Sequence, residues 1–290
     1  MAGGLTLDVV DAGFGVHIRG ISIAGIDDHD FSTIRELLTE YPLLVFPGQH
    51  PTLDEQNEFA RRFGPLEFPA AAITNIAPDG TVLNDQDHDT VKSIRGNEGW
   101  HHDSTYMPIQ AFGAVVSAEI VPPDGAPTGF ADMRAAFDAL DDATRDRLRG
   151  LRARHSLYYS QGRSGYLPTP DADGGYAMYG YHTKETPVRP LVKVHPDTGR
   201  ENLLIGRHAH DIEGMDPIES EELLDRLNEQ ACADGRVHYH QWQVGDVVVW
   251  DNRRLMHRAT EFDLRHPRRI WHTRIAGAPE TEAADNHREG

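Results

Sequence analysis

The sequence is poor in cysteine, in basic residues and in long apolar segments. Its single cysteine, Cys232, cannot form an internal disulfide, and the N-terminal segment lacks the basic and apolar regions of a secretion signal, so we expect a cytoplasmic protein. No apolar run approaches the roughly 18 residues of a membrane-spanning helix. Lysine and arginine number 28 against 46 acidic residues, a net charge of −18. This charge repels phosphate backbones and anionic lipids, so we expect a small-molecule partner, with neither nucleic acid nor membrane.

The chain also lacks internal repeats and linker-like segments, so residues 1–290 are expected to form one domain. Apolar spacing, capping residues and glycine stops predict helices at 30–41, 52–64, 132–149 (as one helix or two) and 217–233. Short apolar runs between turn residues predict strands at 42–46, 112–121, 130–133, 190–194, 202–205, 237–244, 246–250 and 268–275. This pattern predicts a fold that is mainly β, a sandwich or barrel with helical additions.

Two details of this pattern bear on the arrangement of the chain. Val244, Gly245 and Asp246 separate two predicted strands by a short turn, which predicts a hairpin over 237–250. Residues 66–96 and 157–188 show no clear pattern. Irregular segments of that length inside a compact domain are typical of active-site lids or binding loops.

Seventeen histidines are the unusual count in the composition and direct attention to metal chemistry. In an extended segment, residues two apart point the same way, about 6.6 Å from each other. His101 and Asp103, in Trp100-His101-His102-Asp103, can therefore bind one metal ion. His257, which follows the strand 246–250 and a polar turn, is the best third ligand. Two histidines and one carboxylate form the facial triad of non-heme iron oxygenases, which leaves three coordination positions open.

Other histidines have similar spacing. The acidic segments Asp28-His29-Asp30 and Asp87-His88-Asp89 are typical of solvated turns, while His208-x-His210 and His238-x-His240 keep a ligand-like spacing. A structural zinc site would be closed by four ligands, and one cysteine cannot supply the usual sulfur set. The surroundings of His101, Asp103 and His257 distinguish them from these pairs.

Those surroundings include an arginine at the start of the last predicted strand. Alternation places Arg268, Ile270 and His272 on one face of the strand and Arg269 on the other. If His257 ends one strand and Arg268 starts the next, antiparallel pairing can bring their side chains together. A guanidinium near an open iron site suits a dicarboxylate co-substrate, because it grips a carboxylate with two parallel hydrogen bonds.

These segments resemble the family of iron(II)/2-oxoglutarate dioxygenases that includes taurine dioxygenase and the dichlorophenoxyacetate dioxygenases. The resemblance covers about residues 5–278 and rests on the order and spacing of Leu44–Phe46, Phe63–Leu66, Trp100–Asp103, Thr128, Gly150–Ala153, Val194–Pro196, Trp250–Arg253, His257 and Arg268. It implies a double-stranded β-helix (jelly-roll) core over that range, and we expect the tail at 279–290 to be flexible.

The resemblance also implies the site. Iron(II) would be held by His101, Asp103 and His257, and 2-oxoglutarate would chelate the metal while Arg268 and Thr128 bind its distal carboxylate. Reaction with O2 would release succinate and CO2 and oxidise a nearby C–H bond. A carboxylate at Asp103 argues against a halogenase, because the related halogenases carry a small residue there. Relatives form dimers and tetramers, which implies a homo-oligomer.

The sequence differs from these relatives at the position that binds substrate. Taurine and dichlorophenoxyacetate dioxygenases carry a second arginine four residues after the first, where this chain has His272. Histidine is charged only below a pKa near 6.5, so a substrate that needs a permanent cation at that position is not expected. The candidate substrate contacts are Asn97, Tyr106, Arg207, His208 and His272, with an apolar wall at Phe68 and 70–72 and two more tyrosines, Tyr158 and Tyr159.

We therefore predict a non-heme iron(II) and 2-oxoglutarate-dependent dioxygenase that hydroxylates or oxidatively cleaves a small organic acid or amine. Two alternatives come from other classes. A metal-free jelly-roll binding protein would respond to neither chelators nor iron, and a zinc hydrolase with the same three ligands would act without O2 and form no succinate. Arg268 and Thr128 favour the dioxygenase, because neither alternative needs them.

Overall fold

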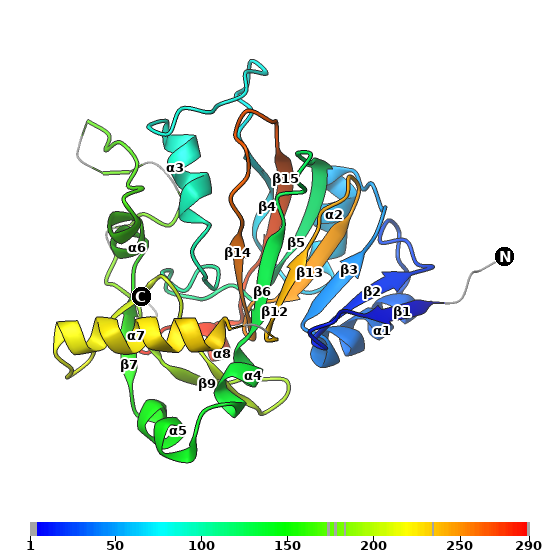
Figure 1. The fold of residues 1–290 in the computed structure, drawn as a ribbon. Coiled ribbons are helices and arrows are strands. Elements are labelled where there is room, and N and C mark those ends of the chain that lie inside the picture. Colours follow the sequence, from blue (N-terminus) through cyan, green and yellow to red (C-terminus); the bar gives the residue numbers. More distant parts are fainter. Residues whose placement is uncertain (1–4, 173–174, 177–178, 183, 234, 289–290) are drawn as a thin grey trace.

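Two facing β-sheets form the centre of the molecule (Figure 1). The computed structural model describes residues 5–172, 175–176, 179–182, 184–233 and 235–288. The large sheet contains, in spatial order, β1 (Thr6–Val9), β2 (Gly15–Arg19), β3 (Leu43–Phe46), β13 (Val247–Asp251), β5 (Gly113–Ile120), β15 (Arg269–Ile275) and β4 (Leu66–Thr74). The small sheet contains β12 (Val237–His240), β6 (Thr128–Asp132) and β14 (Leu255–Ala259). The predicted jelly-roll class is confirmed.

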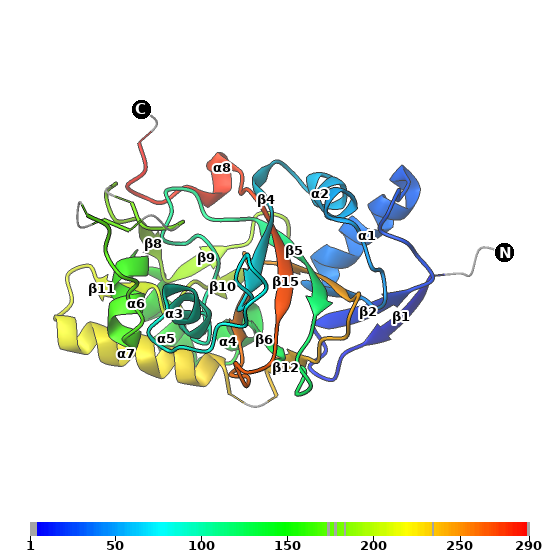
Figure 2. The ribbon, with the colours of Figure 1, turned by 90° about the horizontal axis from the view of Figure 1, so that it is seen from above.

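The other elements cover these sheets (Figures 1 and 2). Helices α1 (Asp28–Glu40) and α2 (Leu53–Arg61) pack on the outer face of the large sheet. A second hydrophobic core beyond the small sheet joins α4 (Met133–Asp138), α5 (Asp142–Arg149), α7 (Pro217–Ala231), β7 (Arg152–His155), β9 (Val192–Val194), β10 (Glu201–Leu203) and β11 (Ala209–Ile212). The remaining elements are α3 (Asp89–Gly96), α6 (Leu157–Ser164), β8 (Val188–Pro190) and α8 (Pro279–Glu282). In the described ranges no helix has the length and apolar composition that crossing a bilayer requires.

Strands β3 and β13 show why continuous apolar runs form the centre of the large sheet. Val248 and Trp250 face the small sheet, whereas Val247 and Val249 pack beneath α1 and α2. Successive side chains of a strand point to opposite faces, so a strand that is covered on both sides must be apolar at every position. Strand β14, which carries His257, thus faces an apolar wall.

The helices begin close to where their capping residues predicted. Thr52 and Glu55 form a capping box at the start of α2, and Asp216 caps α7. The segment 132–149 forms two helices, because Asp141 caps α5 separately. Side-chain oxygens satisfy the free N–H groups of a first helical turn, and for this reason such sites are recognisable in a sequence.

The hairpin predicted over 237–250 is wrong. Strand β12 pairs with β6 in the small sheet, whereas β13 pairs with β3 and β5 in the large sheet. Residues 241–246 carry the chain from one sheet to the other. The expected strand pairing of His257 with Arg268 is wrong for the same reason, because β14 and β15 belong to different sheets. Their side chains instead line one cavity between the sheets.

The structure also corrects three segments that were expected to be irregular or flexible. Strand β4 and helix α3 lie within 66–96, and α6 lies within 157–188. Residues 279–288 are packed rather than flexible, since Glu282 is buried and forms an ion pair with Lys193. Backbone bonds from Ala284 to Pro108 and from Asp285 to Val188 fix this tail further. Residues 289–290 lie outside the described part.

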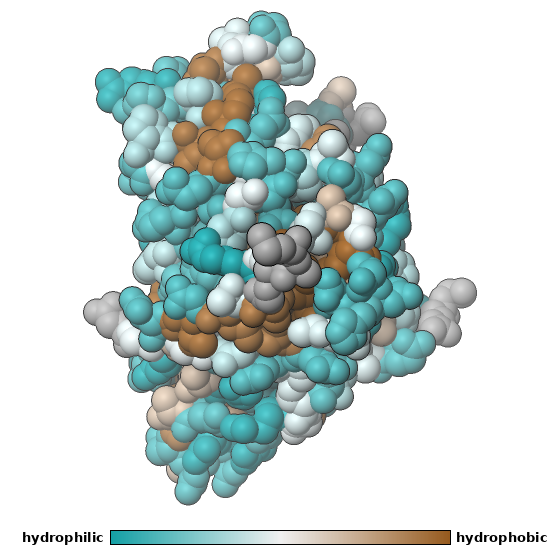
Figure 3. Space-filling model, turned by 90° about the vertical axis from the view of Figure 1, so that its right-hand side faces the viewer, coloured by the Kyte–Doolittle hydropathy of each residue, from teal (hydrophilic) through white to brown (hydrophobic). Residues whose placement is uncertain are grey.

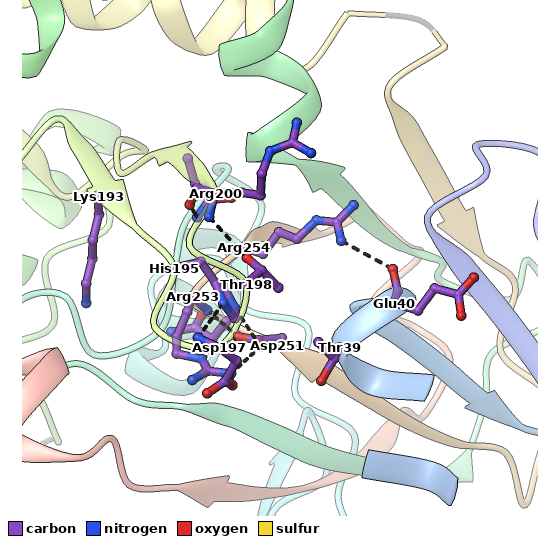
Figure 4. Close-up of polar contacts among 12 residues, drawn as sticks. Thr39, Glu40, Lys193, His195, Asp197, Thr198, Arg200, Asp251, Arg253 and Arg254 are labelled. Carbon is purple, nitrogen blue, oxygen red and sulfur yellow. Dashed lines mark hydrogen bonds and ion pairs between the residues drawn. The ribbon is translucent and has the colours of Figure 1, made fainter. Parts of the chain in front are cut away.

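A buried ion-pair network holds the turn between β13 and β14 (Figure 4). Arg253 donates to both carboxylate oxygens of Asp251, and its Nη2 is also 2.6 Å from Asp197. His195 Nε2 lies 3.0 Å from the same Asp251 carboxylate. Burial would raise the pKa of Asp251, but Arg253 and His195 hold this pKa well below its usual range. Asp251 is therefore ionised and anchors the turn that leads to His257.

Replacing Asp251 by asparagine should lower the free energy of unfolding by about 3–5 kcal/mol at pH 7, because it leaves Arg253 buried without its anion. The low pKa of Asp251 stabilises the folded state above the unfolded-state pKa of about 3.9. The difference between the two proteins should therefore shrink as the pH falls below about 4. Urea denaturation at several pH values measures this. Asp263→Asn, which breaks an exposed pair with Arg265, is the control and should leave the urea midpoint unchanged. An equal loss at all pH values would contradict the prediction.

Candidate metal centre and substrate cavity

His101 and His257 lie opposite each other on adjacent backbone segments. His101 N–H donates to the His257 carbonyl at 3.0 Å, and His257 N–H to the His101 carbonyl at 2.8 Å. The two ring centroids are 4.2 Å apart. Asp103 follows two residues later, and one ligand atom from each of the three side chains lies within 4.8 Å of the others. Three buried residues from distant parts of the sequence could thus hold one ion.

Hydrogen bonds orient His101 and the backbone of Asp103 and leave one potential ligand atom on each side chain. Nδ1 of His101 is 2.7 Å from the carbonyl oxygen of Gly99. Because a carbonyl only accepts, Nδ1 carries the proton and Nε2 is left for a metal. The Asn252 side chain accepts from Asp103 N–H at 2.7 Å and donates to Asp103 O at 3.0 Å, which fixes the backbone of Asp103. Oδ2 of Asp103 lacks an aligned hydrogen bond. A buried carboxylate oxygen of this kind beside two imidazoles fits a divalent cation.

The charge of Asp103 is set by its surroundings. Burial alone would raise its pKa, but Arg274, whose Nη2 is 2.6 Å from Oδ1, holds this pKa well below its usual range, and His257 and His272 act in the same direction. Burial lowers the pKa of His257 to about 4 and that of His101 well below its ordinary value. The carboxylate is therefore ionised and both imidazoles are neutral at pH 7, the states in which these groups bind metals.

A second group, His195, Asp197 and Asp251, also has its ligand atoms within 4.8 Å of one another. Arg253 already donates to both of its carboxylates, so a cation would be repelled there (Figure 4). Among the histidines with similar spacing, His88 caps α3 by accepting the N–H of Thr90. The solvated turns predicted at Asp87–Asp89 and Asp28–Asp30 are instead the exposed starts of helices α3 and α1.

Arg268 lines a cavity of about 120 Å³ that the three potential ligands also line. Arg268 is 6% exposed, and none of the described residues forms an ion pair or hydrogen bond with its guanidinium. Burial lowers the pKa of Arg268 to about 10, so it remains charged at pH 7. A buried cation without a partner is costly unless an anion binds to it. Arg269 points outward to Glu119, as strand alternation predicted.

Thr128 lines the same cavity, and its hydroxyl is oriented by a tryptophan. Nε1 of Trp242 donates to Thr128 Oγ1 at 2.9 Å. Since the indole can only donate, the Thr128 oxygen accepts and keeps its own proton for a ligand. Trp242 was not singled out in the sequence, where nothing distinguished it from a core aromatic residue.

Trp242→Phe should raise KM for 2-oxoglutarate about 2- to 12-fold with little change in kcat, the effect of one lost hydrogen bond of about 0.5–1.5 kcal/mol. Initial-rate kinetics with varied 2-oxoglutarate measure both constants. Trp271→Phe is the matched control, because the Trp271 indole binds Glu119 on the outer face. An unchanged KM in the Trp242 variant would show that the hydroxyl is oriented in another way.

The structure brings four of the five candidate substrate contacts to the cavity: Asn97, Tyr106, His208 and His272. Arg207 is the exception, because it binds Gln161 and Ser164 and does not line the cavity. The expected contribution of Tyr158 and Tyr159 is also wrong, since neither lines it and Tyr159 stacks on His210 instead. These positions depend on how α6 packs, which local spacing does not reveal.

The sequence analysis missed Arg274, a second permanent cation of this cavity besides Arg268. It lies two residues after His272 on β15, and the same alternation that links Arg268 to His272 would have reached it. Its side chain is buried, its Nη1 donates to Ser104 at 3.0 Å, and its Nε has no partner among the described residues. His272 therefore does not leave the site without a fixed positive charge.

A second cavity of about 200 Å³ adjoins the first, and both are lined by Arg274, His272, Tyr106, Asn97, Leu157 and Ile73. The other lining residues of the second cavity are largely aromatic or small: Phe68, Ala71, Tyr179, Tyr181, Ser93 and Gln161. The apolar wall expected at Phe68 and 70–72 is present at Phe68 and Ala71. The site thus joins the cavity that the three potential ligands and Arg268 line to a second one whose remaining lining is largely aromatic or small.

The sequence model of the family described as "Taurine catabolism dioxygenase TauD, TfdA family" matches residues 6–275. The chain belongs to this family. It is 53% identical over 279 residues to the (S)-phenoxypropionate/alpha-ketoglutarate-dioxygenase of Sphingobium herbicidovorans, a match that covers 96% of this chain and 97% of the relative. It is 36% identical over 272 residues to the alpha-ketoglutarate-dependent 2,4-dichlorophenoxyacetate dioxygenase of Cupriavidus pinatubonensis, covering 85% and 92%.

Solved structures agree. The crystal structure of AAD-2 in complex with Mn(II) and N-oxalylglycine matches with a TM-score of 0.88 and 32% identity over 98% of this chain and 100% of that one. This TauD/TfdA protein is a non-heme iron(II) dioxygenase that uses 2-oxoglutarate and O2 to oxidise a small organic molecule, as the sequence predicted. The alternatives of an inactive binding protein and a zinc hydrolase are set aside.

Proposed function

We propose that the enzyme oxidises 2-aryloxypropanoates, with the (S) enantiomer preferred, and that Arg274 binds the substrate carboxylate. The observation that carries this proposal is a buried guanidinium at the junction of a metal-ligand chamber and an aromatic chamber. The two relatives that are 53% and 51% identical both act, by their names, on (S)-phenoxypropionate. An aromatic ring and a carboxylate are the two groups that this site is built to receive.

Charge balance supports a substrate with one negative charge. The charged residues among the described lining of both cavities are Asp103, Arg268 and Arg274. With a ferrous ion these groups sum to three positive charges, and the dianion 2-oxoglutarate neutralises two. One positive charge remains, which suits a monocarboxylate and disfavours an amine, because a buried charge is costly unless it is paired.

In this proposal His101, Asp103 and His257 hold the iron, and Arg268 with the Thr128 hydroxyl binds the distal carboxylate of 2-oxoglutarate. The converging ligand atoms and the unpaired guanidinium fit these two groups. The bound iron supplies the oxidising power that C–H cleavage needs. The protein orients both carboxylates, and Phe130, Trp250 and Ile270 exclude water from the chamber.

The outcome for an aryl ether follows from its own chemistry. Hydroxylation of the carbon that carries the ether oxygen forms a hemiketal. This species collapses as the hydroxyl loses its proton and the bond from carbon to the aryl oxygen breaks, which yields a phenol and a 2-keto acid. No nucleophilic side chain is required.

Arg274→Gln should lower kcat/KM for 2-phenoxypropanoate at least about 10- to 150-fold, because hydrogen bonds to charged groups contribute about 1.5–3 kcal/mol. KM for 2-oxoglutarate should change little, since Arg268 remains. Phenol and succinate release measure the two effects. Arg269→Gln, on the outward face of the same strand, is the matched control. Unchanged kcat/KM for the acid would refute the role of Arg274.

We also propose a single dioxygenase domain, a cytoplasmic location, no nucleic-acid partner, and a homo-oligomer, dimer or tetramer. The edge strand β1 exposes Leu7 and Val9, the preceding Leu5 is exposed as well, and this side of the molecule shows apolar patches among polar residues (Figure 3), which supports self-association. Light scattering after size-exclusion chromatography tests the oligomeric state, and a monomer at micromolar concentration would refute it.

A further inference from the structure

The position of Arg274 decides which carbon of a bound acid lies beside the metal ligands. Its Nη2 is 2.6 Å from Oδ1 of Asp103, and its Nη1 is 3.0 Å from Ser104 Oγ. The ring of Phe68 covers the guanidinium at 4.8 Å from the ring centroid. These three contacts fix the orientation of the guanidinium. A carboxylate that it binds stays next to Asp103, and so does the carbon attached to that carboxylate.

The rest of such a molecule must extend away from the ligands. The second cavity begins at Arg274, and none of His101, Asp103 and His257 is among its described lining residues. Of the two cavities, the first is lined both by Arg274 and by the three potential ligands. A C–H bond beside those ligands must therefore lie in the first cavity. The α-carbon is the first atom after the carboxylate, while an aryl group two bonds further lies among Phe68, Tyr179 and Tyr181.

From this arrangement we infer a second activity, α-hydroxylation of 2-methyl-3-arylpropanoates, in which a methylene group replaces the ether oxygen. The inference rests on the proposed binding of the carboxylate by Arg274. In this arrangement Arg274 binds the carboxylate and the second cavity accommodates the ring, so neither contact involves the ether oxygen. Ether cleavage is then a property of the substrate, whereas oxidation of the α-carbon is the property of the site.

The reaction is balanced by the co-substrates that the family uses. One oxygen atom of O2 is inserted into the Cα–H bond, and the other enters succinate as 2-oxoglutarate loses CO2 and supplies two electrons. The product is a 2-hydroxy acid. Because no aryloxide is attached to the oxidised carbon, the product has no leaving group and remains a stable tertiary alcohol.

The methylene analogue separates positioning from intrinsic reactivity. Its Cβ hydrogens are benzylic and therefore activated by the ring, so a loosely held substrate would yield the 3-hydroxy acid. A misplacement of about 1 Å costs as much as about 100-fold in rate. An anchored substrate should therefore yield the 2-hydroxy acid in at least about tenfold excess.

The test uses the enzyme with iron(II), 2-oxoglutarate and O2, and each enantiomer of 2-methyl-3-phenylpropanoate with deuterium at Cα. Mass spectrometry distinguishes the products, because only the 2-hydroxy acid has lost the deuterium. We expect this product with one succinate for each alcohol. Arg274→Lys keeps the cation but not the rigid fork, so its 2-hydroxy to 3-hydroxy ratio should fall, whereas Arg269→Lys should keep the wild-type ratio. Calorimetric competition against 2-phenoxypropanoate, with Mn(II) and N-oxalylglycine bound, reports binding without turnover.

Two results would count against the inference in different ways. A 3-hydroxy product, or no alcohol while 2-phenoxypropanoate is cleaved in the same preparation, would overturn it and leave the proposed function intact. If 2-phenoxypropanoate itself releases no phenol, the proposed function fails and this inference fails with it.

Discussion

Arg268→Met should raise KM for 2-oxoglutarate about 10- to 150-fold and, in the absence of ligand, stabilise the protein. The first effect is the loss of charged hydrogen bonds worth about 1.5–3 kcal/mol to the distal carboxylate. The second follows because Arg268 is a buried cation without an anionic partner in the described structure. Replacing such a charge by an apolar side chain of similar volume removes a desolvation cost.

Two measurements on one variant make this prediction specific. Initial rates with varied 2-oxoglutarate give KM, and thermal unfolding without ligand gives stability. Arg269→Met is the matched control, since its guanidinium is paired with Glu119 at the surface and should affect neither measurement. A lower melting temperature together with an unchanged KM would show that Arg268 is a structural cation instead.

His101→Ala should abolish turnover, with metal affinity reduced by more than about 100-fold. Loss of an outer-shell partner of a metal ligand costs about 10- to 100-fold, so loss of the ligand itself should exceed that range. Isothermal titration with Mn(II) measures binding, and succinate release measures turnover. The fold should survive, because the backbone bridge between His101 and His257 does not depend on the imidazole.

His88→Ala provides a matched comparison. His88 stands in the sequence Asp87-His88-Asp89, where a histidine also lies close to acidic residues, yet it caps a helix. Its loss should leave Mn(II) affinity and succinate release unchanged. Equal metal affinity in His101→Ala and the wild type would contradict the assignment of the ligands.

Much of the fold was accessible from local patterns. The capping box at Thr52 and the apolar runs of β3 and β13 predicted elements within a few residues, because caps and burial act on neighbouring positions. Pairing was not accessible in the same way. Residues 244–246 look like a hairpin turn, but the strands on either side pair in different sheets, where the free energy comes from packing distant segments.

The residues of the candidate site also fall into those that local patterns predicted and those that depend on distant contacts. The spacing of His101 and Asp103 and the alternation from Arg268 to His272 are local, and they placed these side chains in one cavity. The prediction that Arg207 lines the cavity was wrong, because its guanidinium donates to Gln161 and Ser164 on α6. Alternation along β15 would have placed Arg274 on the same face as Arg268, but its role depends on Asp103, 171 positions away in the sequence.

The sequence by itself determined the chemistry: two imidazoles, a carboxylate and an arginine in the order and spacing of an iron(II)/2-oxoglutarate dioxygenase. Only the tertiary structure decided what surrounds that chemistry, namely which arginine faces the potential metal ligands, which one has no ion pair among the described residues, and where the second, largely aromatic cavity lies. The physical reason is that ligand type and spacing are properties of a short segment. Burial, ion pairing and cavity shape, in contrast, arise when β15, β14 and the loop after His101 meet between the two sheets.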